Sequence, residues 1–224
     1  MESSEIINQI KTIYTDYCIP LNLQRHMFLV AAVAEQLCDN SKDEVDKDNI
    51  VAASLTHDLG NIVKMDFEHE NTLCLLDDED KPKAEFYKKK KTEFVKKYGC
   101  NDLVANEKIV EELQVNERIT YLFKNKGLEH LTHQEWKKDL GLMIFAYADL
   151  RVAPYGVTSL KERVHDFAKR YCKPGDKKCL EDSKRFGVFA KGLEDAIFRQ
   201  MRITPRRINM ASARAYVENY QKNY

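Results

Sequence analysis

Apolar residues recur at helical spacing along nearly the whole chain, and this pattern constrains the fold more than any other feature of the sequence. Eight glycines and five prolines in 224 residues supply few β-turn signals, and no alternating run is long enough to predict a strand. A chain of this length can bury a large core without disulfides. We therefore predict an all-α bundle that forms one domain over residues 1–224.

Capping and helix-stopping residues predict where the helices lie. A first helix begins near residue 3 and ends before Pro20, and Asn22 can cap a second. Further helices are expected at 48–56, 84–98, 101–126 (one or two helices), 133–153 (capping box Thr132 and Glu135), 160–172 (capping box Ser159 and Glu162) and on both sides of Pro205. Together they would cover most of the chain.

The helix expected at 133–153 contains the segment GLMIFAYADL, residues 141–150, which is apolar on every side. A helix without a polar face is surrounded by protein. This helix is therefore predicted to lie at the centre of the bundle, and Pro154 and Gly156 stop it.

Composition argues against several functional classes. Thirty-six basic and thirty-six acidic residues give zero net charge, so the chain lacks the global positive field of a nonspecific nucleic-acid binder. No stretch approaches the roughly eighteen apolar residues of a membrane span. The start MESSEIINQIKTIY lacks the pattern of a secretory signal. We expect a cytoplasmic protein that binds neither nucleic acid nor membrane.

The cysteines give no sign of a disulfide framework or a zinc site. The chain has six, scattered without a CxxC pair. Cys172 and Cys179 flank the turn KPGDKK and could approach each other across it. We predict instead that they are unrelated residues beside a loop, and that the thiols are reduced.

Four polar residues occupy helical positions that should face the core. His26 continues an apolar stripe, three residues after Leu23. His57 and Asp58 continue the buried face of the third helix, and Asp149 lies within the apolar central helix. Burying an ionised carboxylate without a partner is very costly, so these side chains need a shared partner.

A divalent cation satisfies all four side chains together. Neutral imidazole nitrogens and carboxylate oxygens form a mixed ligand shell, and two carboxylates balance a 2+ charge. We predict one metal ion, bound by His26, His57, Asp58 and Asp149. Manganese, magnesium, iron, cobalt, nickel and zinc all suit such a shell, and the sequence does not choose among them.

His26, the pair His57–Asp58 and Asp149, in this order on successive helices, resemble the H…HD…D pattern of the HD-domain superfamily of metal-dependent phosphohydrolases. The resemblance covers about residues 20–160, and the context ASLTHDLGN is typical of that family. It implies an HD-like bundle with the metal site at its centre, on which helices from 160–224 would pack. It also implies that the metal orients a phosphate ester and activates water.

Residues after the HD pair are candidates for catalysis and substrate binding. Lys64 could bring an ammonium group to a phosphate, and Asp66 a carboxylate to a water. Asn61 stands where some relatives carry an acid, and an amide cannot act as a base. We therefore assign catalysis to Asp58, Lys64 and Asp66, with Asn61 and Lys64 in substrate binding.

Two arginines lie next to predicted ligands in the sequence. Arg25 precedes His26, and Arg151 follows Asp149 by two residues, so both are candidates for binding substrate phosphate. Adjacent helical residues diverge by about 100°, however, and the same arginines could leave the core. Tyr155 and Gly156 could shape the rim of the pocket.

The predicted function is hydrolysis of a phosphate ester, as a phosphomonoesterase or phosphodiesterase. The substrate would be a nucleotide or another small phosphorylated metabolite, and the protein could form a homo-oligomer. Asn61 keeps open a second interpretation, a regulatory module that binds a metal and a nucleotide without turnover. A di-iron oxygenase is disfavoured because the additional histidines available, His69, His130 and His133, fall in predicted loops or at a helix start.

Overall fold

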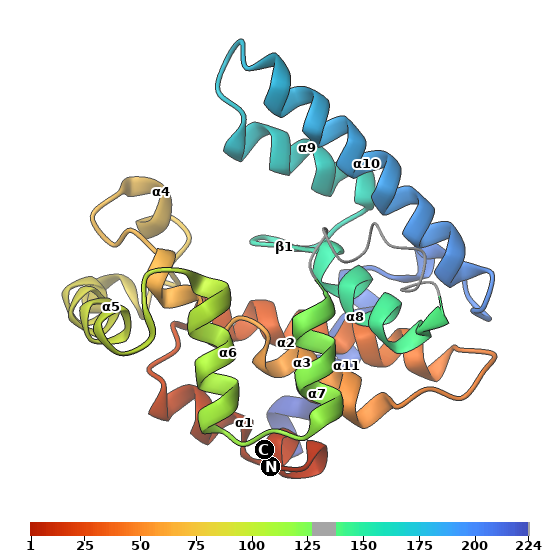
Figure 1. Cartoon of the computed structure of the whole chain (residues 1–224), viewed down its shortest axis with the longest axis horizontal. Coiled ribbons are helices and arrows are strands. Elements are labelled where there is room, and N and C mark those ends of the chain that lie inside the picture. Colours follow the sequence, from red (N-terminus) through yellow and green to blue (C-terminus); the bar gives the residue numbers. More distant parts are fainter. Residues whose placement is uncertain (127–137, 224) are drawn as a thin grey trace.

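The computed structural model describes residues 1–126 and 138–223, and within these ranges the fold is helical as predicted. Figure 1 shows the helices as a bundle with one hairpin that extends from it. The α-helices are α1 (Ser3–Asp16), α2 (Leu21–Asp39), α3 (Lys47–Thr56), α4 (Glu70–Leu73), α5 (Ala84–Tyr98), α6 (Asp102–Glu112), α7 (Glu117–Asn125), α8 (Leu140–Leu150), α9 (Leu160–Tyr171), α10 (Lys177–Phe198) and α11 (Met210–Asn223).

Short elements join these helices. Within the described ranges the 3-10 turns are η1 (Leu59–Lys64), η2 (Lys81–Lys83) and η5 (Pro205–Arg207). Between α8 and α9 the chain forms an antiparallel pair, β1 (Val152–Ala153) with β2 (Gly156–Val157), in which Val152 faces Val157. This two-residue ladder is too short to leave an alternating pattern in the sequence, and Pro154 begins its turn.

The core is built around α2, α3 and α8. Helix α2 packs against α3, α8 and α11, while α1 covers α3 and α10 contacts α8. Every residue of α8 from Gly141 to Ala148 is buried, which confirms the prediction that this helix lies at the centre. No helix in the part of the chain that the structure describes is long and apolar enough to span a bilayer.

Most predicted helix ends are confirmed by local geometry. The capping box of Ser159 and Glu162 forms at the start of α9. Gly99 ends α5 with a positive φ of 98°, a conformation that glycine adopts readily. The predicted cap of the second helix was wrong: α2 begins at Leu21 with Pro20 at the N-cap position, so Asn22 lies inside its first turn.

The start of the central helix was predicted wrongly. Helix α8 begins at Leu140, where the side chain of Asp139 accepts a hydrogen bond of 3.0 Å from the backbone N–H of Leu142. Arg118 holds the same carboxylate with hydrogen bonds of 2.7 and 2.9 Å. A long-range partner therefore stabilises this cap, which a local pattern cannot reveal. Thr132 and Glu135, the predicted capping box, lie outside the described residues.

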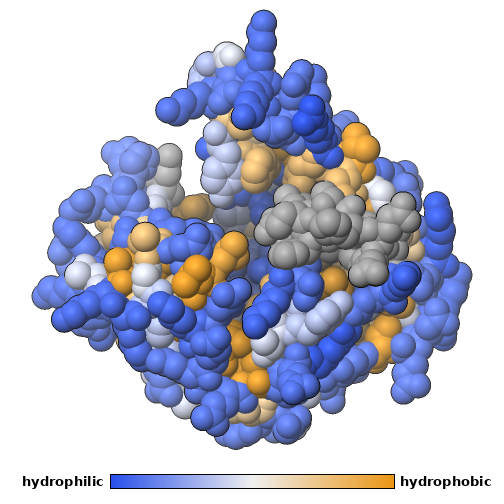
Figure 2. All heavy atoms as spheres, viewed as in Figure 1, coloured by the Kyte–Doolittle hydropathy of each residue, from blue (hydrophilic) through white to orange (hydrophobic). Residues whose placement is uncertain are grey.

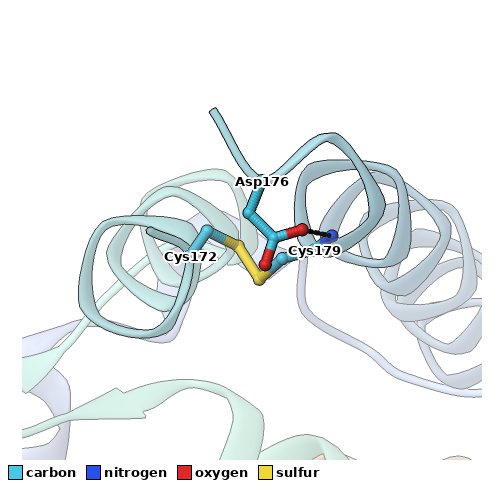
Figure 3. The surroundings of a disulfide bond; sticks show 3 residues. All are labelled: Cys172, Asp176 and Cys179. Carbon is cyan, nitrogen blue, oxygen red and sulfur yellow. Dashed lines mark hydrogen bonds between the residues drawn. A yellow bond between two sulfur atoms is a disulfide. The ribbon is translucent and has the colours of Figure 1, made fainter. Parts of the chain in front are cut away.

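Helices α9 and α10 form a hairpin that projects from the bundle at the top of Figure 1, while α10 also packs against α8. A disulfide between Cys172 and Cys179 closes its turn, with Cα atoms 5.4 Å apart (Figure 3). The prediction that these cysteines are unpaired was wrong. The side chain of Asp176 accepts a 3.0 Å hydrogen bond from the backbone N–H of Cys179 and so starts α10, which brings the second cysteine back towards the first.

Gly60 allows the chain after the HD pair to pack closely on α6. A Cβ atom at this position would lie 2.5 Å from the backbone nitrogen of Asn106 and 2.7 Å from the backbone oxygen of Asp102. The backbone N–H of Gly60 also donates a 3.1 Å hydrogen bond to the buried side chain of Asn106. This close approach fixes η1, and with it the cavity-facing residues described below.

We expect Gly60→Ala to lower the free energy of unfolding by about 1–3 kcal/mol, because the added methyl group would meet backbone atoms that cannot rotate away. Gly192 in α10 is a matched control, since a methyl group added there would meet no atom of the described residues within 4 Å. Gly192→Ala should raise stability by about 0.5–1 kcal/mol through helix propensity. Urea unfolding of both variants measures the difference, and equal effects would contradict the close packing.

Candidate metal centre

The four predicted ligands come together from three separate helices. Helix α2 supplies His26, the end of α3 supplies His57 and Asp58, and the last turn of α8 supplies Asp149. Helix α3 ends at Thr56, and Asp58 takes φ −125° and ψ 20°, so the chain turns into η1 at the HD pair. The turn places both side chains of the pair on the same side, towards α2 and α8.

Donor atoms of His26, His57 and Asp58 all lie within 4.8 Å of one another, and Asp149 borders this group on the side of the two histidines. The Nε2 atoms of His26 and His57 each lie 3.5 Å from Oδ1 of Asp149. They lie 3.7 and 3.6 Å, respectively, from Oδ2 of Asp58. These distances are long for a hydrogen bond. Ligand atoms about 2.0–2.2 Å from one metal ion are about 3.0–3.5 Å from each other, close to the separations found here.

His57 supplies the clearest evidence that the site fits a cation. Its Nδ1 lies 2.7 Å from the backbone oxygen of Ser54, which can only accept, so Nδ1 carries the proton. In the neutral imidazole Nε2 is then an acceptor that faces two carboxylates, which are acceptors too. The side chain is 0% exposed, and Nε2 has no hydrogen-bond partner among the described residues. A bound cation would resolve this arrangement of acceptors.

Both carboxylates are ionised at neutral pH. Burial acts to raise the pKa of Asp58, but nearby positive charge, on the ring of His57 when it is protonated and on the ammonium group of Lys126, lowers it. The same charges outweigh burial at Asp149 and hold its pKa well below the ordinary value. Lys126, at 3.7 Å from Oδ2 of Asp149, is only 15% exposed. The centre therefore carries two negative charges, and a divalent ion would balance them.

The metal centre opens into a cavity of about 530 Å³. Figure 2 shows the surface hollowed between the α9–α10 hairpin at the top and the bundle below it. Among the described residues its cationic lining consists of Lys64, Lys124, Lys126, Arg163 and Arg170, its acidic lining of Asp58, Asp102, Glu107 and Asp149, and its aromatic lining of Phe123, Phe167, Tyr171 and Phe186. A cavity of this size suits a small metabolite.

Two predicted substrate-binding residues line this cavity. Asn61 does so from the first turn of η1, and Lys64 from its last residue. Lys64 donates a 2.6 Å hydrogen bond to Asp102. Burial acts to lower its pKa, but attraction to Asp58 and Asp102 raises the pKa above the ordinary lysine value. Lys64 is therefore a fixed positive charge at the cavity wall.

Asp66 was predicted as a catalytic residue, and the structure places it elsewhere. Its side chain is exposed, does not line the cavity, and accepts a 3.1 Å hydrogen bond from the backbone N–H of Glu68. The 3-10 turn η1 ends at Lys64 and the backbone becomes extended at Met65, so Asp66 no longer follows the helical spacing of Asn61 and Lys64. Tyr155 and Gly156 also lie outside the cavity lining, and only Pro154 of that turn contributes.

The two arginines beside the ligands do not reach the cavity either. Arg25 is exposed and pairs with Asp77 at 2.7 Å. Arg151 is buried, and its guanidinium donates to the hydroxyl of Tyr147 at 2.5 Å and to the backbone oxygen of Ile208 at 2.7 Å. Neither arginine lines the cavity, because helical geometry turns these side chains away from the neighbouring ligands.

The sequence did not identify Lys126 or the arginines and aromatic residues of the hairpin. Lys126 follows the end of α7, and a lone lysine at a helix terminus is ordinary. Basic and aromatic residues at positions 163, 167 and 170 have helical spacing, which indicates that they share one face of α9. The neighbouring sequence does not indicate that this face lines a cavity. His69 is exposed and does not line the cavity, while His130 and His133 lie outside the described residues.

We expect the purified protein to bind one divalent ion per chain. His57→Ala and Asp149→Ala should each weaken that binding by more than about 100-fold, because each removes a ligand and leaves the remaining charges unbalanced. His165→Ala in α9 is a matched control, since this histidine is exposed and outside the cavity. Titration with Mn²⁺ and elemental analysis measure the outcome. Two ions per chain would contradict the single-metal assignment and favour a di-iron centre.

Comparison with known protein families agrees with this geometry. A family model described as the HD domain matches residues 23–149, more than half of the chain, from just before His26 to Asp149. No curated protein and no solved structure matches the chain significantly. The match spans all four predicted metal ligands, and it confirms the resemblance seen in their order. The chain belongs to the HD-domain family.

Proposed function

We propose that this protein is a metal-dependent phosphohydrolase that cleaves a phosphate ester of a small phosphorylated metabolite, with nucleotides among the candidates. One observation carries the proposal: Nε2 of buried His57, without a hydrogen-bond partner among the described residues, faces two ionised carboxylates at a cavity lined by lysines and arginines. Membership of the HD-domain family supports hydrolysis of this general type. The family assignment alone does not name the substrate.

The charge of the cavity favours an anionic ligand. The four acids and five cations of its described lining nearly balance, so a bound divalent ion would make the site clearly positive. A metal in this position polarises a phosphoryl oxygen and lowers the pKa of bound water. His26, His57, Asp58 and Asp149 would hold the ion, while Lys126 and Lys64 would attract the phosphate oxygens.

Fewer residues are candidates for accepting the proton of the attacking water than the sequence alone suggested. Asn61 is an amide and cannot take a proton, and Asp66 faces solvent. Asp102 already accepts from Lys64. Among the described residues this leaves Asp58, Asp149 and Glu107 as carboxylates of the cavity that can accept a proton. Asp58 is the candidate from this set that the sequence had also assigned to catalysis.

A regulatory module is the alternative, and Asn61 is the observation that favours it. This residue lines the cavity where some relatives carry an acid, so the site could bind a nucleotide without turning it over. A metal-dependent rise in nucleotide affinity without phosphate release would support this alternative. Steady phosphate release would favour the hydrolase.

We expect phosphate release from at least one ester in a panel of phosphorylated metabolites supplied with Mn²⁺, Mg²⁺, Co²⁺ or Ni²⁺. Asp58→Ala should lower kcat by at least about 1,000-fold, because it removes both a metal ligand and a negative charge at the reacting centre. Chelation with EDTA should abolish release, and adding back metal should restore it. Activity that survives both treatments would contradict metal-dependent hydrolysis.

Lys126 gives a second test of the same proposal. Lys126→Met keeps the length of the side chain and removes the charge 3.7 Å from Asp149, so kcat/KM should fall by about 10- to 100-fold. Lys184→Met is the matched control, since Lys184 is exposed on α10 and does not line the cavity. Equal kinetics for the two variants would show that Lys126 is not part of the active site.

A further inference from the structure

One wall of the cavity comes from the α9–α10 hairpin, which lies outside the residues that match the HD domain. Helix α9 contributes Arg163, Phe167, Arg170 and Tyr171, and α10 contributes Phe186. The residues from α9 recur at helical spacing and so lie on one face. Figure 1 shows this hairpin above the bundle, with β1 beneath it. The part of the chain that holds the metal site and the part that forms this wall are therefore distinct.

The two arginines of the wall are held in place by one carboxylate. Oδ2 of Asp166 accepts hydrogen bonds from Arg163 at 3.1 Å and from Arg170 at 3.0 and 2.6 Å. Asp166 is 12% exposed, so this contact is largely shielded from water. Two guanidinium groups against one carboxylate leave one excess positive charge and several unused donors. Such a preoriented pair suits a phosphate or carboxylate, which guanidinium groups bind with paired hydrogen bonds.

The aromatic residues of the wall form a continuous group beside these arginines. The ring of Phe167 lies 4.8 Å from the ring of Tyr171 and 5.6 Å from that of Phe186. Arg170 lies over Tyr171, with its guanidinium carbon 5.2 Å from the ring centre. Tyr171 is 60% exposed although it packs against Phe167. An exposed aromatic face at a cavity provides a surface on which a flat ring can stack.

We propose that the α9–α10 hairpin selects the substrate of the metal centre. Tyr171 and Phe167 would pack against a planar ring of the substrate, and Arg163 and Arg170 would bind an anionic group other than the phosphate at the metal. The chemical class is a phosphate ester that carries an aromatic ring and a second anionic group. This inference rests on the proposed hydrolase function, but it concerns residues outside the family match.

Three ligands separate the two contributions of the hairpin. Ribose 5-phosphate has neither feature, adenosine 5′-monophosphate adds the ring, and adenosine 3′,5′-bisphosphate adds a second phosphate. Tyr171→Ala should lower the kcat/KM ratio of the monophosphate to ribose 5-phosphate by about tenfold, the size of a lost stacking contact. Arg170→Gln should lower the ratio of the bisphosphate to the monophosphate by about tenfold, because a charge-assisted contact is lost.

Matched controls exist for both variants. Tyr155 is 66% exposed, similar to Tyr171, and lies outside the cavity lining. Arg185 on α10 also lies outside it, with a side chain 80% exposed. Tyr155→Ala and Arg185→Gln should leave both ratios at the wild-type value. Thermal unfolding of all four variants checks that the hairpin remains folded.

Calorimetric titration of the metal-loaded protein with the same three ligands separates failure of this inference from failure of the proposed function. One outcome is that no ligand is hydrolysed, while Tyr171→Ala weakens binding of the ligands that carry a ring and Arg170→Gln weakens binding of the bisphosphate. That outcome would overturn the proposed hydrolase function and retain the hairpin's role in ligand selection. Turnover with unchanged ratios in both variants would overturn the hairpin's role and retain the hydrolase. Binding of none of the three ligands would overturn the hairpin's role as well.

Discussion

Two ionised carboxylates face two imidazole nitrogens at one cavity, and this arrangement requires three helices of the bundle to meet there. Asp58 and Asp149 come from different helices, as do His26 and His57, so α2, α3 and α8 must converge to place them. Both carboxylates are only partly exposed, and charges of one sign repel more strongly where contact with water is limited. A shared cation would turn this repulsion into attraction and would tie three core helices together.

The order of helices follows from the sequence because the apolar spacing is strong and the end signals are local. Gly99 and the Ser159–Glu162 pair act through their own backbone neighbours, so a pattern can identify them. The start of α8 depends instead on Arg118, which lies 21 residues away from Asp139. The pairing of Cys172 with Cys179 depends on the turn that Asp176 forms, whereas the spacing alone had led us to predict unpaired cysteines.

The metal ligands could be predicted because they break an otherwise apolar pattern. A histidine or aspartate on a buried face needs a hydrogen-bond partner, an ion of opposite charge or a metal ion, and few arrangements of residues provide one. The residues of the cavity wall do not interrupt an apolar pattern. Lysines, arginines and aromatic residues are common on partly exposed helix faces such as those of α7 and α9, so the sequence does not distinguish them. Proximity in sequence was also misleading. Arg25 adjoins His26 yet pairs with Asp77, and Arg151 follows Asp149 yet binds the backbone of the carboxyl-terminal segment.

Two parts of the chain line the cavity. Residues 23–149 match the HD domain and include the four candidate metal ligands together with Lys64 and Lys126. The segment after β2 adds a hairpin whose turn is closed by a disulfide and whose inner face carries arginines and aromatic rings. We propose that the first part carries out the metal-dependent hydrolysis and that the hairpin determines which substrate binds.

An anomalous-difference map from crystals grown with Mn²⁺ would show directly whether one metal ion binds at this centre. We expect a single peak within bonding distance of Nε2 of His26, Nε2 of His57 and the carboxylates of Asp58 and Asp149. A second peak in the cavity, or a single peak away from these four side chains, would contradict it.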